Sequence, residues 1–463
     1  MTLIKSISGI RGTIGGSVGE NLTPVDAVKF AAAYGQWLKE AYPQGPYKVV
    51  VGRDARPSGE MIQYLVMQTL VGQGIDVLDL GLSTTPTVEV AVPMEAAQGG
   101  VILTASHNPK EWNALKLLNH KGEFLSAAAG ALILEIAQSE RFDFSAVDDL
   151  GVITPDHSYI DKHIESILAL PLVDVPAIKA KQFRVVIDGV NSTGGIAVPR
   201  LLRALGVDTI ELYCTPDGQF PHNPEPLKEH LTDLMDAVVT HKAHMGFVVD
   251  PDVDRLAIVD EKGAMFGEEY TLVAVADYVL SKTPGDTVSN LSSSRALRDV
   301  TLSRGGQYQA SAVGEVNVVA MMKETSAVIG GEGNGGVIYP ELHYGRDSLV
   351  GIALFLSHLA HLDTSVSALK ASYPFYAMSK NKVALTPELD VDGLMSQIAQ
   401  TYQSSERVNT VDGVKIDFED SWVHLRKSNT EPIIRIYTEA SSQENADDLA
   451  LRFVNELKQL AGI

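Results

Sequence analysis

Short apolar runs alternate with loops rich in glycine and serine along most of the chain before Pro374. In the clearest case, the apolar run Tyr47–Gly52 is followed by a polar loop, a longer amphipathic stretch at about Glu60–Gly72 and a second apolar run at Gly74–Leu80. Short apolar runs bounded by glycine are typical of buried strands, and the longer stretch between them is typical of a helix. This order predicts a βαβ unit of a parallel sheet.

The same unit recurs twice further along the chain. The runs Phe183–Asp188 and Gly206–Leu212 enclose a helix that opens at Asn191-Ser-Thr-Gly-Gly. A third copy runs from Asp286, through a serine-rich loop, to Gly305–Ala310. Repetition over such long intervals indicates duplicated domains and not a solenoid. We therefore predict three similar α/β domains with mixed, largely parallel sheets.

Beyond Pro374 the pattern changes to a strand, a helix at about Asp392–Tyr402, two or three further strands and a last helix at Gln443–Leu460. This order predicts a C-terminal α+β domain. One face of the last helix is apolar, so we expect it to pack on the core of its own domain. The residues of that face are Leu449, Phe453, Leu457 and Leu460.

Domain boundaries are expected in the polar loops between these patterns. The loops lie near Asp148–His157, Asp260–Gly263 and Ser372–Pro374. They divide the chain into α/β domains at residues 1–152, 153–260 and 261–372 and an α+β domain at 373–463.

Composition and charge narrow the class of protein. Of the 463 residues, 45% are hydrophobic and 21% charged, as in ordinary soluble proteins. No run approaches the roughly 18 apolar residues of a membrane helix, and the N-terminal residues lack a secretory signal. Cys214 is the single cysteine, so we expect a cytoplasmic protein without an intramolecular disulfide. The formal net charge of −21 argues against nucleic acid and anionic membranes as partners.

A hydroxyl-rich loop with the sequence TASHNP follows the apolar run Gly99–Leu103. Its Asn-Pro pair favours a turn, so we expect Ser106 at the end of a strand with His107 beside it. Lys116 follows in what is expected to be the next strand. A serine exposed in this way is a candidate nucleophile or phosphate carrier. The alternative is an ordinary turn capped by Ser and Thr.

Three aspartates follow another apolar run, Met245–Val249. Asp250, Asp252 and Asp254 alternate along the chain, and a hard cation such as Mg²⁺ would draw their oxygens to one point. The loop lacks the glycine and glutamate positions of a calcium-binding EF-hand loop. The alternative is an acidic loop of solvated aspartates.

Two further polar loops are candidate ligand sites. The loop GGEGNGG at residues 330–336 offers only Glu332 and Asn334 as side chains, a pair that suits sugar hydroxyls. It lacks the Lys-Ser/Thr of a phosphate-binding P-loop and could also be a flexible turn. The segment RKSNTEP at residues 426–432, with Arg435 nearby, has the basic and hydroxyl groups of a phosphate site. Arg11, which follows Gly9 and precedes Gly12, is a third candidate ligand-binding group.

TASHNP, DPDVDR, the Glu-x-Asn glycine loop and RKSNTEP occur in this order, and together they resemble the α-D-phosphohexomutase superfamily over essentially the whole chain. The resemblance implies four domains around a central cleft. It implies a mutase that interconverts hexose 6-phosphate and hexose 1-phosphate through a phosphoserine enzyme and a hexose 1,6-bisphosphate. It also implies one Mg²⁺ per active site, a small sugar phosphate as partner, and a monomer or homodimer.

The resemblance assigns roles to individual residues. It makes Ser106 the phosphoserine, which binds Mg²⁺ with Asp250, Asp252 and Asp254. Lys116 corresponds to a proposed general base. The remaining implied residues are catalytic Arg11, substrate-binding Arg255, Glu332 and Asn334, and a group that binds the non-reacting phosphate, formed by Arg426, Ser428, Asn429, Thr430 and Arg435. His107 is a further catalytic candidate, because its place beside Ser106 lets it orient or polarise the serine oxygen.

The sequence departs from the family pattern at the sugar loop. Gly336 stands where a histidine often assists acid–base chemistry, and His343 is a candidate replacement. Chain length and Val313-Gly-Glu-Val resemble bacterial phosphoglucosamine mutases, whereas Asn429 resembles phosphomannomutases. We expect glucosamine 6-phosphate as substrate, with Glu315 as a carboxylate for its ammonium group. The alternatives are a phosphomannomutase or phosphoglucomutase and, in other classes, a metal-dependent sugar phosphatase or a non-catalytic sugar-phosphate sensor.

Overall fold

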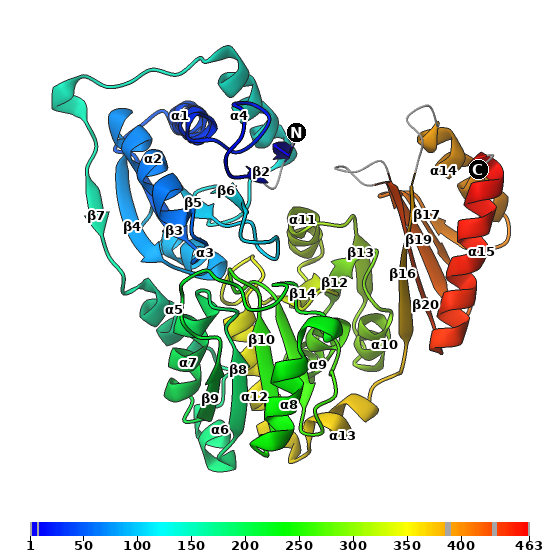
Figure 1. Cartoon of the computed structure of the whole chain (residues 1–463). Coiled ribbons are helices and arrows are strands. Elements are labelled where there is room, and N and C mark those ends of the chain that lie inside the picture. The colour runs from blue at the N-terminus through cyan, green and yellow to red at the C-terminus, as the bar shows by residue number, and fades with distance from the viewer. Residues whose placement is uncertain (1, 7–8, 385–389, 428–432, 462–463) are drawn as a thin grey trace.

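The computed structural model of the chain describes residues 2–6, 9–384, 390–427 and 433–461. These residues form four domains, each built on one sheet (Figure 1). The first three combine parallel strands with helices and one or more antiparallel strands, and the fourth has an antiparallel sheet. The predicted fold class is confirmed.

The first domain contains a seven-stranded sheet with the order β1-β2-β6-β5-β3-β4-β7. Strands β5, β3, β4 and β7 are mutually parallel, whereas β6, β2 and β1 join antiparallel. The strands are β1 Ile4–Ser6, β2 Gly9–Thr13, β3 Lys48–Arg53, β4 Asp76–Leu82, β5 Gly99–Leu103, β6 Trp112–Leu118 and β7 Ile153–Pro155. The helices are α1 Pro24–Ala41, α2 Gly59–Gly72, α3 Thr85–Met94 and α4 Ala127–Ser139. Because β7 pairs with β4, the first sheet reaches Pro155, beyond the expected boundary at residue 152.

The second and third domains repeat a smaller version of this arrangement. Their sheets have the orders β11-β10-β8-β9 and β13-β12-β14-β15, in which only β11 and β15 are antiparallel to their neighbours. The second domain contains α5 Tyr159–Leu168, α6 Val175–Lys181, β8 Arg184–Asp188, α7 Gly194–Ala204, β9 Asp208–Leu212, α8 Thr232–Thr240, β10 Met245–Val249 and β11 Leu256–Asp260. The third contains α9 Glu268–Lys282, β12 Thr287–Asn290, α10 Ala296–Ser303, β13 Tyr308–Ser311, α11 Glu315–Thr325, β14 Ile329–Glu332, β15 Gly336–Ile338, α12 Ser348–Leu362 and α13 Val366–Ala371.

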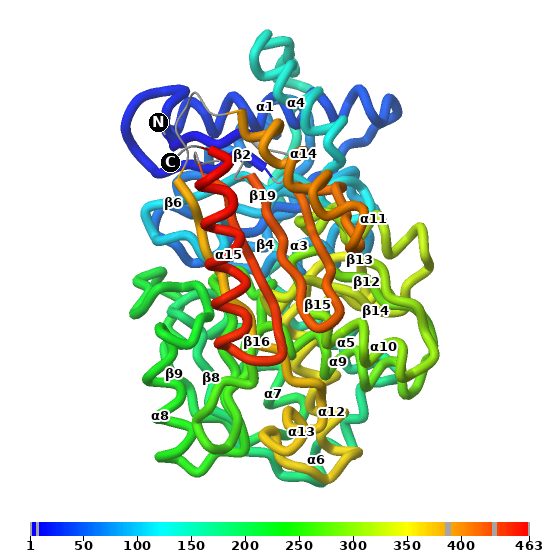
Figure 2. Tube along the Cα trace, turned by 90° about the vertical axis from the view of Figure 1, so that its right-hand side faces the viewer, coloured from blue at the N-terminus to red at the C-terminus, as the bar shows by residue number. Residues whose placement is uncertain are grey.

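The fourth domain has a five-stranded antiparallel sheet with the order β16-β20-β19-β18-β17. Its elements are β16 Ala377–Ala384, α14 Val391–Tyr402, β17 Arg407–Asn409, β18 Val414–Asp417, β19 Trp422–Lys427, β20 Ile433–Ala440 and α15 Gln443–Ala461. Four strands follow α14 in the described residues, where the sequence predicted two or three, because β17 is too short to show an alternating pattern. Helix α15 lies along the sheet beside β16 and β20 (Figure 2) and buries Phe453 and Leu457, as predicted.

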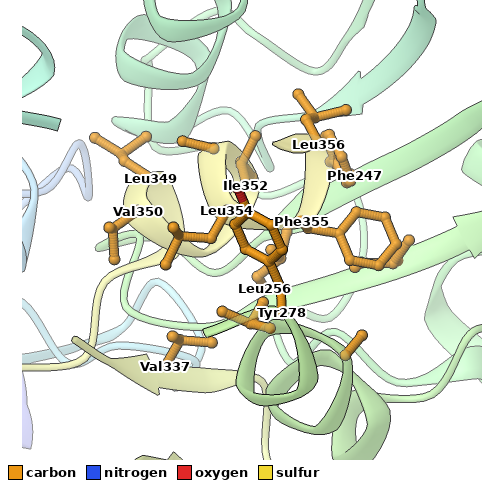
Figure 3. Close-up of a cluster of buried hydrophobic side chains, with 14 of the residues drawn as sticks. Phe247, Leu256, Tyr278, Val337, Leu349, Val350, Ile352, Leu354, Phe355 and Leu356 are labelled. Carbon is orange, nitrogen blue, oxygen red and sulfur yellow. The ribbon is translucent and has the colours of Figure 1, made fainter. Parts of the chain in front are cut away.

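Helix α12 is mostly apolar, is buried from Ser348 to Ala360, and joins the cores of the second and third domains. It contacts α5, α6 and α7 of the second domain and α9 of the third. Figure 3 shows its side chains among those of both domains, where the Phe355 ring lies 6.2 Å from that of Phe247. No described helix is long and apolar enough to cross a membrane.

Candidate active site

Three turns in equivalent positions bring the sequence motifs together. In each of the first three domains, a parallel strand ends in a turn that leads into an antiparallel strand, namely β5–β6, β10–β11 and β14–β15. Ser106 lies in the first turn, the three aspartates in the second and Asn334 in the third. The turns line adjoining cavities of about 450 and 470 Å³ that share six lining residues. These are His107, Arg255, Val313, Glu332, Asn334 and Arg426.

The backbone of Ser106 has φ +50°, a left-handed conformation that is uncommon outside glycine. Its amide donates to the Thr104 hydroxyl at 2.9 Å, and its carbonyl accepts from the Arg56 guanidinium at 2.9 Å. Arg56 is itself fixed by Asp54 at 2.8 Å, and both side chains are fully buried. This buried pair holds the turn in an otherwise unfavourable conformation.

The Ser106 side chain points at the second turn. Its Oγ donates to Asp250 Oδ2 at 2.7 Å and lies 3.3 Å from His107 Nδ1. Burial, aided by Arg255 and Arg11, lowers the pKa of His107 well below its usual range, which favours the neutral imidazole. Arg11 reaches the same loop by donating to Asn108 Oδ1 at 2.8 Å.

The aspartate turn is held by its own backbone. Val253 has φ +65°, and Asp250 Oδ1 accepts from the amides of Asp254 and Arg255 at 3.1 Å each. A β-branched residue in this conformation is strained, and the two hydrogen bonds oppose its relaxation. The turn therefore presents three fully buried carboxylates as one cluster.

These carboxylates suit a divalent cation. The oxygens of Asp250, Asp252 and Asp254 approach within 4.8 Å of one another, and Asp252 Oδ1 and Asp254 Oδ1 have no hydrogen-bond partner among the described residues. Burial and the two neighbouring carboxylates raise the pKa of Asp250 well above its usual range. A hard cation would relieve that repulsion and would bind the two unpartnered oxygens.

Lys116 lies at the edge of the aspartate cluster. Its Nζ donates to Asp252 Oδ2 at 2.7 Å and lies 3.6 Å from Asp254 Oδ2. Burial favours the neutral amine, but Asp252 and Asp254 outweigh it and raise the pKa of Lys116. The Thr85 hydroxyl donates to the same Asp252 oxygen at 2.6 Å.

Arg346, which lies in none of the sequence motifs, joins the aspartate turn to the sugar loop. Its guanidinium donates to Asp254 at 2.6 Å, to Glu315 at 3.0 Å and to Glu332 at 2.8 Å. The three carboxylates come from three separate segments, so no local spacing indicated the network. The Gly-Arg-Asp sequence at residues 345–347, after the glycine loop, was the one feature of the sequence that could have indicated a role for Arg346.

Arg346→Met is expected to lower the free energy of unfolding by about 3–5 kcal/mol, because three buried carboxylates lose their shared cation. Urea denaturation followed by circular dichroism measures the loss. Arg298→Met is the matched control, since Arg298 is 36% exposed and pairs with Asp299. Its loss should stay below about 1 kcal/mol, and equal losses in both variants would contradict the assigned role of Arg346.

The sugar loop places Glu332 and Asn334 at both cavities. Glu332 also accepts from Asn290 Nδ2 at 2.9 Å and from the Gly314 amide at 3.1 Å. A Cβ at Gly335 would lie 2.4 Å from the Leu256 carbonyl, and one at Gly336 would lie 2.3 Å from Arg346. At these two positions, glycine makes room for other segments of the protein.

The fourth domain contributes basic side chains from three neighbouring strands, β16, β20 and β19. Arg426 on β19 is paired across the ladder with Arg435 on β20, and both line the first cavity with Lys380. Asp412 fixes Arg426 at 2.9 Å. The predicted site residues Ser428, Asn429 and Thr430 lie outside the described residues.

Two predicted residues are placed differently from expectation. His343 lies with His163 and Asp347 and is not among the lining residues of either cavity. Glu315 lines the second cavity, but both its oxygens accept from Arg346, so it is not the free carboxylate that was expected. Helix packing brought Arg346 to Glu315, and this long-range contact has no sequence signature.

Four parts of the chain match the four domains of one protein family. Residues 3–144, 158–263 and 267–376 match phosphoglucomutase/phosphomannomutase alpha/beta/alpha domains I, II and III. Residues 384–456 match the C-terminal domain of the same family.

Similar proteins include phosphoglucomutase/phosphomannomutases and probable phosphoglucosamine mutases. The chain is 37% identical over 440 residues to a phosphoglucomutase/phosphomannomutase from Thermococcus kodakarensis, covering 94% of this chain and 95% of that protein. It is 34% identical over 454 residues to a probable phosphoglucosamine mutase from Methanopyrus kandleri, covering 98% and 97%. The structure of a phosphoglucomutase/phosphomannomutase family protein from Burkholderia thailandensis superimposes with a TM-score of 0.85 at 26% identity, covering 99% of this chain and 98% of that one.

Proposed function

The chain belongs to the phosphoglucomutase/phosphomannomutase family of phosphohexomutases, and on this premise we propose how it works and on which sugar. Ser106 carries the phosphoryl group that is transferred. The observation that supports this role is the Ser106 hydroxyl, 2.7 Å from a buried aspartate in the cleft that also contains Arg426 and Arg435.

The reaction runs as two balanced transfers. The bond between phosphorus and Ser106 Oγ breaks while the free hydroxyl oxygen of a hexose phosphate bonds to phosphorus, and the hydroxyl proton passes to a base. The product is a hexose 1,6-bisphosphate. After the sugar has turned over in the cleft, its other phosphoryl group returns to Ser106, and the freed sugar oxygen regains a proton.

The residues around Ser106 divide this work. Arg11 and Arg255 balance the charge that spreads over the phosphoryl oxygens, because such transfers depend mainly on positioning and electrostatics. His107, 3.3 Å from Ser106 Oγ, is the candidate for the base. Lys116, on the adjoining strand, holds its proton because Asp252 and Asp254 outweigh burial and raise its pKa, so it suits the return of a proton to the freed sugar oxygen. The unpartnered oxygens of Asp252 and Asp254 support a cation site. Mg²⁺ bound by Asp250, Asp252, Asp254 and phosphorylated Ser106 would supply further neutralising charge.

Arg426→Ala and Arg435→Ala should raise KM by about 10–100-fold with little change in kcat. Each guanidinium holds a phosphate that is present in both the ground state and the transition state. Steady-state kinetics measure the split, and Arg452→Ala on α15 of the same domain is the control. A loss confined to kcat would instead put these arginines at the reacting phosphoryl group.

Glucosamine 6-phosphate, converted to glucosamine 1-phosphate, is the proposed substrate. The similarity to a probable phosphoglucosamine mutase favours it, and an ammonium group suits a protein of net charge −21. One charged hydrogen bond to the ammonium group would make kcat/KM for glucosamine 6-phosphate about 10–100-fold higher than that for mannose 6-phosphate. Measuring kcat/KM for glucosamine, mannose and glucose 6-phosphates in parallel tests this.

A higher value for mannose 6-phosphate would overturn the amino-sugar assignment and leave the mutase class intact. Following inorganic phosphate in the same reactions separates a mutase from a phosphatase. A mutase forms the isomer without net release of phosphate, whereas a phosphatase releases it.

A further inference from the structure

A second cluster of side chains that could bind a metal lies outside the candidate active site, where the first three domains meet. His163 on α5, His343 before α12 and Asp347 at the start of α12 bring one ligand atom each within 4.8 Å of the others. The Nε2 atoms of His163 and His343 lie 3.0 and 3.4 Å from the same oxygen, Asp347 Oδ2. Ligands bonded to Zn²⁺ at about 2.0–2.1 Å in a tetrahedron stand about 3.3 Å apart, so these separations suit the ion.

Outer partners orient all three side chains in the manner typical of metal ligands. The second ring nitrogen of His163 lies 3.1 Å from the Thr87 hydroxyl. The second oxygen of Asp347 accepts from the amides of Leu349 and Val350 at 2.8 and 3.3 Å. The second ring nitrogen of His343 faces Glu89 Oε2 at 3.4 Å, which is a carboxylate–histidine arrangement.

Unpartnered buried atoms provide a separate indication of a ligand. His343 Nδ1 and both carboxylate oxygens of Glu89 have no hydrogen-bond partner within the part of the chain that the structure describes. Their side chains are only 7% and 1% exposed. A neutral imidazole has one N–H group. Without an ion, His343 donates this N–H from Nε2 to Asp347. A cation at Nε2 would leave that proton for Nδ1, which could then donate to Glu89.

We propose that His163, His343 and Asp347 bind one Zn²⁺ that ties the second and third domains together, with Thr87 and Glu89 of the first domain as outer partners. Two imidazoles with one carboxylate suit Zn²⁺, whereas Mg²⁺ prefers oxygen ligands. The site lies behind the aspartate turn, because Thr85 at the start of α3 donates to Asp252 and the Ser348 amide of α12 donates to the Val253 carbonyl at 3.2 Å. The ion therefore positions α3 and α12, which support the turn, and takes no part in phosphoryl transfer.

The test uses the full chain, treated with chelator, dialysed and saturated with Mg²⁺ so that the aspartate site holds its hard cation. Zn²⁺ is then titrated, bound metal is counted by elemental mass spectrometry, and the melting temperature is recorded. In parallel, Co²⁺ is added as a spectroscopic probe. We expect one Zn²⁺ per chain and a higher melting temperature. With a water as the fourth ligand, we also expect the intense visible absorption of four-coordinate Co²⁺.

Three variants locate the ion. His343→Gln should lose the stoichiometric Zn²⁺ and the Co²⁺ absorption, whereas Glu89→Gln should weaken binding about 10–100-fold by removing an outer partner. His358→Gln is the matched control, since His358 is a buried histidine that contacts Tyr373 instead of the cluster. It should bind Zn²⁺ like the unaltered chain.

Two results would overturn the proposal. One is the absence of Zn²⁺ binding by the folded, unaltered chain, which would make the cluster a hydrogen-bonded His–Asp–His unit. The other is equal binding by the unaltered chain and His343→Gln. If His343→Gln does not fold, the Co²⁺ spectrum of the unaltered chain decides, because weak six-coordinate absorption excludes a tetrahedral site.

Discussion

Ser106→Ala should reduce mutase turnover by at least about 10³-fold while leaving substrate binding nearly unchanged. The reason is that the hydroxyl oxygen forms and breaks the transferred bond, and alanine has no oxygen in its place. The Cβ remains, so the strained turn keeps its contacts with Thr104 and Arg56. Isomer formation from the 6-phosphate measures the loss.

Covalent labelling distinguishes this role from a structural one. Incubation with hexose 1,6-bisphosphate carrying labelled phosphate should label the unaltered chain and leave Ser106→Ala unlabelled. Ser292→Ala is the matched control, because Ser292 lines the adjoining cavity and hydrogen-bonds to His424. It should retain labelling, whereas equal labelling of Ser106→Ala would remove Ser106 from the mechanism.

Asp252→Asn should reduce activity by about 100-fold or more and weaken the response to Mg²⁺. Replacing one of three carboxylates lowers the attraction of the site for a hard cation, and the charge balance at the phosphoryl group is worth several kcal/mol. Activity measured across a Mg²⁺ titration of chelated protein tests both effects.

Asp260→Asn is the control for this change. Asp260 is a buried aspartate at the far end of β11, where it accepts from the amides of Lys262 and Ala264. Its variant should keep the Mg²⁺ response of the unaltered chain. Full activity of chelated, unaltered protein would contradict the proposed metal requirement.

The sequence predicted those parts of the fold and site that local pattern determines. Each apolar run became a strand, with its ends displaced by a few residues, because period and flanking glycines are local signals. Ser106 and the aspartates were anticipated at strand ends for the same reason, and duplicated domains bring equivalent strand ends together.

Long-range contacts were not predictable in this way. Arg346 meets carboxylates from three segments, and His163 meets His343 across a separation of many elements. Glu315 was expected to bind the ammonium group of the substrate. Instead, α11 packs against the segment before α12, and both Glu315 oxygens accept hydrogen bonds from Arg346. Such contacts depend on how whole domains pack, so no characteristic residue spacing in the sequence predicts them.

Helix α12 determines which fragments of the chain can fold independently. Because its side chains are buried on all sides between the second and third domains, a fragment that ended near residue 260 would expose the face of the second domain that α12 covers. The second and third domains should therefore melt in one calorimetric transition. The fourth domain has its own core, and the chain enters it near residue 374. Arg295 and Lys415 also hydrogen-bond across its border with the third domain. Cleavage near residue 374 should therefore leave a fragment that folds on its own once these contacts are broken.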